Sequence, residues 1–92
     1  MTEDQAETIA AQALGWLASD PDLMGVFLGA SGMSIDDLRG GAGSPEILGA
    51  VLDFVCMDDD WVVRFCDDTG RRYEDPARAR AVLAGPAGMH WT

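Results

Sequence analysis

The stretch ALGWLASDPDLMGVFLGASG, residues 13–32, decides the fold, because a second stretch repeats its pattern 38 residues later. That second stretch is VLDFVCMDDDWVVRFCDDTG, residues 51–70, and the two align without a gap. Five positions are identical in both copies: one leucine, two aspartates, one phenylalanine and the closing glycine. Each copy therefore predicts an apolar helix, an acidic cap, a second helix and a glycine stop, which together form a helical hairpin.

Capping residues mark the helix boundaries in the first half of the chain. Thr2-Glu3-Asp4-Gln5 is spaced as a capping box, so the first helix is expected over about residues 3–18. Asp20-Pro21 combines an N-cap with a first-turn proline and opens a second helix. Gly32 then ends that helix as a left-handed stop.

The same signals continue through the rest of the chain. Ser34 with Asp37 opens only a short turn of helix before a glycine-rich connector. Ser44-Pro45 starts the next long helix, and an aspartate at 58 or 59 caps the one after it. Asp75-Pro76 starts the last helix.

No part of the sequence shows sustained alternation of apolar and polar residues, so we expect an all-α fold. The predicted architecture is a compact small bundle of five to six short helices in a single helical domain, 1–92. Two pseudo-repeated hairpins, about 6–32 and 44–70, would pack face to face. A C-terminal helix over about 76–84, ended by Gly85-Pro86, would close them.

The hairpins bury their apolar faces against each other in this interpretation, which predicts a core of ten side chains. They are Leu14, Trp16, Leu17, Phe27, Leu28, Leu48, Leu52, Val55, Trp61 and Phe65. Common ancestry of the two copies stays open, because two amphipathic hairpins can resemble each other without a duplication.

Charge is distributed unevenly. The formal net charge is −10, and residues 1–60 carry twelve acidic side chains against one arginine. Such a surface repels nucleic-acid phosphates and favours basic partners, although it also serves solubility. The N-terminus lacks the basic and apolar regions of a signal peptide, and no apolar run is long enough to span a bilayer. We therefore expect a cytoplasmic protein with no membrane and no nucleic-acid partner.

Several kinds of site are excluded or disfavoured by composition. The chain has no lysine and one histidine, His90, which removes Schiff-base, P-loop-lysine and multi-histidine metal chemistry. The Asp58-Asp59-Asp60 run lacks the glycine and glutamate of an EF-hand loop. The short segment after Gly32 is too acidic for a DNA-recognition helix. We therefore predict no catalytic, cofactor-binding or metal-binding residue, and no cofactor.

Cys56 and Cys66 are the speculative functional residues. In the repeat they stand opposite Ala18 and Leu28, which are small or apolar packing positions. Two thiols of a cytoplasmic protein are normally reduced, and buried cysteines behave as small apolar residues. Structural cysteines are the favoured interpretation, with a redox or metal-responsive pair as the alternative.

The stretches ALGWLASDPDLMGVFL (13–28) and LDFVCMDDDWVVRF (52–65), with the closing HWT (90–92), resemble a family of short alphaproteobacterial proteins known only as a domain of unknown function. These motifs consist of packing and capping residues. The resemblance therefore implies a small bacterial helical domain and brings no catalytic or binding residue.

The leading functional hypothesis is a non-enzymatic helical module that binds or regulates a protein partner not identified by the sequence. It rests on a well-capped, core-forming pattern without an assembled nucleophile, base and electrophile. Two alternatives are a thiol-based protein that uses Cys56 and Cys66, and an acidic mimic that occupies a basic or nucleic-acid-binding protein. The oligomeric state is not specified by the sequence.

Overall fold

The computed structural model describes residues 1–41 and 43–89, with side chains described as far as Ala84. This part of the chain contains six helices and no strand, so the predicted all-α fold is confirmed. The helices are α1 Glu3–Ala18, α2 Pro21–Ser31, α3 Ile35–Gly41, α4 Pro45–Val55, α5 Asp59–Thr69 and α6 Asp75–Met89.

The predicted capping box begins α1. The Gln5 amide donates to Thr2 Oγ1 at 3.1 Å, and the Thr2 amide donates to Gln5 Oε1 at 2.9 Å. Two backbone donors that have no partner inside the helix are satisfied in this way. The helix then runs from Glu3 to Ala18, the boundaries that the sequence predicts.

The helices α2 and α5 occupy equivalent positions in the two copies, and each has 11 residues. Asp20 caps α2 by accepting from the Leu23 amide, and Asp58 caps α5 by accepting from the Asp60 amide. Gly32 and Gly70 end them with φ angles of 74° and 73°. These positive angles are the predicted left-handed stops, a conformation that glycine adopts without a steric penalty.

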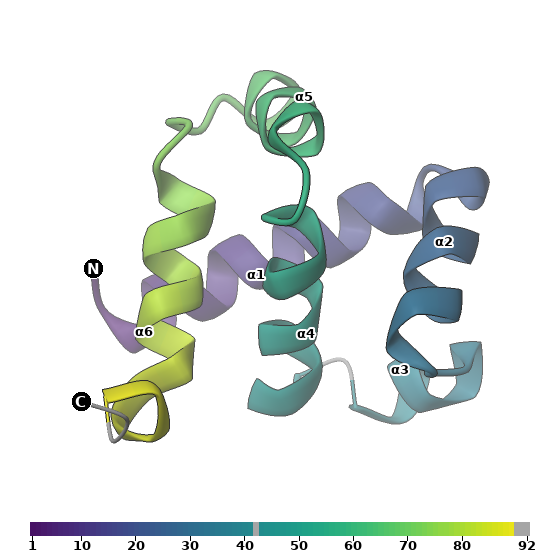
Figure 1. The fold of residues 1–92 in the computed structure, drawn as a ribbon, viewed down its shortest axis with the longest axis horizontal. Helices are drawn as coiled ribbons and strands as arrows, with labels where there is room; N and C mark the ends of the chain where they lie inside the picture. The colour runs from purple at the N-terminus through teal and green to yellow at the C-terminus, as the bar shows by residue number, and fades with distance from the viewer. Residues whose placement is uncertain (42, 90–92) are drawn as a thin grey trace.

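Three helices form the centre of the fold. In Figure 1, α1 runs across the back of the molecule, and α4 and α6 cross it side by side. Each of the three packs extensively against the other two, so α6 closes the bundle as predicted. The second helices, α2 and α5, change direction after α1 and α4 instead of running back along them (Figure 1). The two copies are therefore open helix pairs, called here the first unit (α1, α2) and the second unit (α4, α5).

The last helix differs from the prediction. It was expected to end at Gly85-Pro86 but runs on to Met89. Proline removes a hydrogen-bond donor and hinders the preceding turn, which normally breaks or bends a helix. The final turn of α6 departs from the direction of the first part in Figure 1, and the helix continues past Pro86.

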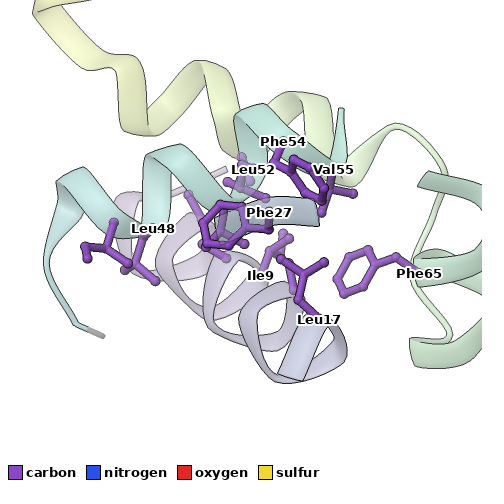
Figure 2. Packing of buried hydrophobic residues seen from close by; sticks show 14 of the residues in the cluster. Ile9, Leu17, Phe27, Leu48, Leu52, Phe54, Val55 and Phe65 are labelled. Atoms are coloured by element: carbon purple, nitrogen blue, oxygen red, sulfur yellow. The ribbon is translucent and has the colours of Figure 1, made fainter. Parts of the chain in front are cut away.

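The core is a hydrophobic cluster to which all six helices contribute buried side chains. The contribution of α6 to this cluster is Ala79. Figure 2 shows Phe27 lying among Leu52, Phe54 and Ile9, and Phe65 approaching Leu17 from α5. Of the ten expected core residues, six are buried: Leu17, Phe27, Leu48, Leu52, Val55 and Phe65. The other four are partly buried and pack against the cluster: Leu14, Trp16, Leu28 and Trp61.

Two aromatic pairs connect the units. Trp16 of α1 packs edge to face on Phe65 of α5, with ring centroids 5.8 Å apart. Phe27 of α2 packs in the same way on Phe54 of α4, at 5.2 Å. A shift of 38 residues converts Trp16 into Phe54 and Phe27 into Phe65, so each pair is the counterpart of the other. The first helix of each unit thus holds the second helix of the other unit.

Candidate functional site

An apolar groove lies where α1, α2 and α3 meet, with a volume of about 310 Å³. We call it the α3 groove. Five apolar side chains and one arginine line it: Leu14, Ala18, Met24, Ile35, Leu38 and Arg39. Surfaces that bind a partner helix have this composition, with aliphatic and methionine side chains that take up an apolar face.

Local capping fixes the wall of the α3 groove that comes from α3. The Asp37 amide donates to Ser34 Oγ at 3.1 Å, and the Ser34 amide donates to Asp37 Oδ2 at 2.9 Å. This reciprocal cap holds the first turn of a helix of only seven residues. Leu38 is thereby directed into the core, where it is 7% exposed, while Ile35 stays 49% exposed.

The corresponding positions of the second unit are more deeply buried. Leu14 is partly buried and lines the α3 groove, whereas its counterpart Leu52 is completely buried. Pro76, which lies 38 residues after Leu38 and beyond the aligned stretches, is also completely buried. One difference is the length of the third helix, because α3 has 7 residues and α6 has 15. The apolar residues beside the shorter helix, α3, are thus more exposed than those beside α6.

The first turns of the two helices that contribute Met24 and Ile35 to the α3 groove carry carboxylates. Asp36 and Asp37 lie in the first turn of α3, and Asp22 lies in the first turn of α2. Asp22 and Asp36 are exposed and form no ion pair with any described residue. Arg39, in the groove wall, is the one basic side chain of residues 1–60. The groove lining is therefore apolar apart from Arg39, and Asp36 follows the lining residue Ile35 directly in the sequence.

A second apolar cavity, of about 220 Å³, lies between α2 and α4. The aromatic pair Phe27 and Phe54 forms part of its wall. Met33 and Met57 also line it, and Met57 is 75% exposed. Apolar surface is thus available on both sides of the α2–α3 corner, and methionine side chains adapt readily to different partners.

The two cysteines are free thiols. Cys66 is buried in α5, and its Sγ donates to the backbone carbonyl of Arg72 at 3.2 Å. Cys56 is partly buried and caps the C-terminus of α4. Burial raises the pKa of both thiols, and Asp75 and Asp67 raise that of Cys66 further. A raised pKa lowers the reactive thiolate fraction, so these environments favour packing over thiol chemistry.

Residues 3–86 match the family described as protein of unknown function (DUF3572). The chain belongs to this family. The resemblance noted in the sequence is thereby confirmed, and the family description names no activity, substrate or partner. No curated protein and no solved structure matches the chain. The functional site of this DUF3572 protein is therefore inferred from its own geometry.

Two further findings concern the described part of this DUF3572 protein. It holds no group of three or more His, Cys, Asp or Glu side chains placed to bind a metal ion. It also has no helix of the length and apolarity needed to cross a bilayer. His90 and the HWT motif lie outside the described residues.

The α3 groove was not predicted from the sequence. Of its residues, only Leu14 is among the ten expected core positions. A signal was present, because Ile35 and Leu38 are three residues apart on a short helix flanked by glycines. The sequence pattern does not show whether Ile35 or Leu38 stays exposed. Which of the two is buried depends on how α3 packs against α1.

Proposed function

We propose that this DUF3572 protein is a non-catalytic module that binds a helix of another protein in the α3 groove. The observation that carries this proposal is Ile35, a large apolar side chain that is 49% exposed at the edge of an apolar groove. Exposed apolar surface beside a pre-formed groove is typical of helix-in-groove recognition. The capped first turn of α3 presents Ile35 on a fixed backbone, which lowers the entropic cost of binding.

The partner helix is amphipathic, with aliphatic side chains on one face and arginine or lysine beside them. The aliphatic face fits the wall formed by Leu14, Met24 and Leu38. The basic flank fits Asp36, which follows the lining residue Ile35, and the field of residues 1–60, whose net charge is −11 from twelve acids and one arginine. Charge complementarity of this kind increases the association rate and selects against acidic partners.

The test is a quantitative affinity capture from native lysate that compares the natural chain with the Ile35→Asp variant. Aspartate is compatible with the first turn of a helix, so this change removes the apolar contact while α3 is retained. Val63→Asp on α5 is the matched control, because Val63 is 41% exposed and lies outside the groove residues.

We expect a partner that the natural chain and Val63→Asp retain and that Ile35→Asp loses by at least tenfold. Circular dichroism of both variants must show unchanged helix content. Equal retention by all three chains would contradict the proposal, and so would equal loss by both variants.

A further inference from the structure

We infer that a third cavity, called here the arginine cavity, between α1 and the start of α6, binds a small molecule through its phosphate or carboxylate group. This cavity has a volume of about 590 Å³, within the usual range for small-molecule sites. It lies away from the α3 groove and shares no residue with it. Its lining consists of Met1, Asp4, Gln5, Thr8, Ile9, Arg71, Arg72, Asp75 and Arg78.

The charge of this cavity is opposite to that of the chain. Three of the six arginines line it with two carboxylates, which gives a net charge of +1 in a chain of −10. Guanidinium groups bind phosphate and carboxylate oxygens with paired hydrogen bonds, and lysine, the other common phosphate ligand, is absent from this chain. The local composition thus favours an oxyanion in spite of the overall acidity.

Arg71 and Asp75 make contacts within the protein that fix the wall of the cavity, and they are not the groups that we expect to bind the ligand. Arg71 Nε donates to Gln12 Oε1, and Arg71 Nη1 lies 4.0 Å from Asp75 Oδ2. Asp75 also accepts from the Arg72 amide at 3.4 Å. These contacts neutralise Arg71 and Asp75 against each other and fix the backbone that enters α6. The wall is therefore arranged before any ligand binds.

Arg78 and Arg72 are the cations that remain for a ligand. Arg78 forms no ion pair with any described residue, although the chain has sixteen acidic side chains. Arg72 lies 3.8 Å from Glu74, but the two side chains are 78% and 57% exposed, and such surface pairs are weak. Asp4 is the remaining carboxylate of the lining and opposes an anion.

The remaining lining supplies one polar group that complements an oxyanion. Thr8 and Gln5 both lie in the lining, but the Thr8 hydroxyl already donates to the Asp4 carbonyl at 2.9 Å, so of the two Gln5 offers the donor. Gln5 Oε1 is already engaged by the Thr2 amide, which leaves its NH₂ group for another acceptor. Arg78 and Arg72 therefore provide charge, and the Gln5 NH₂ group provides a neutral donor from α1.

The experiment follows backbone amide shifts of the full chain by NMR during titration with inorganic phosphate and, separately, with succinate. Sodium chloride at matched ionic strength corrects for screening. We expect saturable shifts at residues 4–9 and 71–78 with at least one anion. Arg78→Gln should weaken that binding at least tenfold, because a charge-assisted hydrogen bond is lost. Arg64→Gln is the control, since Arg64 pairs with Asp20 and lies outside the cavity residues.

Asp4→Asn provides a second, opposite test. Removal of the opposing carboxylate should tighten binding about threefold, an effect that a misfolded variant cannot mimic. Shifts that stay linear and match those of sodium chloride for both anions would overturn the inference. Binding that survives Arg78→Gln undiminished would also overturn it.

Discussion

Phe27 on α2 packs edge to face against Phe54 on α4, with 5.2 Å between ring centroids and 68° between ring planes. Its counterpart 38 residues away, Phe65, makes the same contact with Trp16 at 5.8 Å and 69°. The two units are therefore connected by two equivalent edge-to-face aromatic contacts. Only the second unit adds a stacked ring, Trp61 on Phe54 at 4.5 Å, because the counterpart of Trp61 is Leu23.

Because both phenylalanines are fully buried, truncating either should be equally harmful. We expect Phe27→Ala and Phe65→Ala each to lower the free energy of unfolding by about 3–5 kcal/mol. Val63→Ala, at an exposed position, should change it by less than about 0.5 kcal/mol. Urea unfolding followed by circular dichroism measures all three. A loss below about 1 kcal/mol at one phenylalanine would show that the contacts are not equivalent.

Glycine substitutions should have opposite effects at two positions of α2. Gly32 has a φ of 74°, so Gly32→Ala forces a left-handed alanine and should destabilise by about 1–2 kcal/mol. Gly25 lies inside α2 with no atom within 4 Å of an added Cβ. Gly25→Ala should therefore stabilise by about 0.5–1 kcal/mol. Thermal unfolding of the two variants checks the signs, and a stabilising Gly32→Ala would contradict the left-handed stop.

The raised pKa of Cys66 predicts that the free energy of unfolding falls in alkaline solution. Burial, followed by Asp75 and Asp67, raises the pKa of Cys66 in the folded protein above its value in the unfolded chain. The folded state then binds more protons than the unfolded chain above the unfolded pKa of about 8.5, so stability falls as pH rises from that value through the higher folded-state pKa. Cys66→Ala should reduce this slope in urea unfolding between pH 7 and pH 10. An unchanged slope would mean that Cys66 is not responsible.

Thiol alkylation gives an independent check of the same burial. With iodoacetamide at pH 7.5, Cys66 should react at a rate limited by unfolding, and Cys56 should react faster because it is only partly buried. Mass spectrometry of the labelled peptides measures both rates. Rapid labelling of Cys66 in the folded chain would support a thiol function and contradict the packing role.

Partner binding should depend on salt. The Asp36 carboxylate and the acidic field of residues 1–60 attract the basic flank of the partner helix, and salt screens exposed charges. Raising sodium chloride from 50 to 500 mM should weaken capture several-fold, and Asp36→Asn should reduce that dependence. Binding that is insensitive to salt would leave the apolar groove as the recognition element but would contradict a basic partner.

Capping chemistry made most of the helix boundaries predictable. The Thr2 capping box, the N-caps Asp20 and Asp58, and the stops at Gly32 and Gly70 all depend on residues within four positions of one another. Such local signals are readable in one sequence. The end of α6 was not predictable in this way, because a proline in a helix does not always end it, and α6 continues past Pro86.

The candidate sites depend on contacts between distant parts of the chain, and these were not predictable from the sequence. The α3 groove requires Leu14 to lie beside Leu38, and the arginine cavity requires Thr8 to lie near Arg78. Helical periodicity identifies Leu14 and Leu38 as apolar-face residues but does not show which of them a neighbour leaves uncovered.

Site-specific photocrosslinking tests the central claim, helix binding in the α3 groove, most directly. A photoreactive phenylalanine derivative is placed at position 35 in one chain and at position 63 in another, since Ile35 edges the groove and Val63 lies outside its lining. The account predicts a crosslink to a partner protein from position 35 alone, with the crosslinked peptide in an amphipathic helix that carries arginine or lysine. Crosslinks of equal yield from both positions, or to a segment that is not helical, would contradict it.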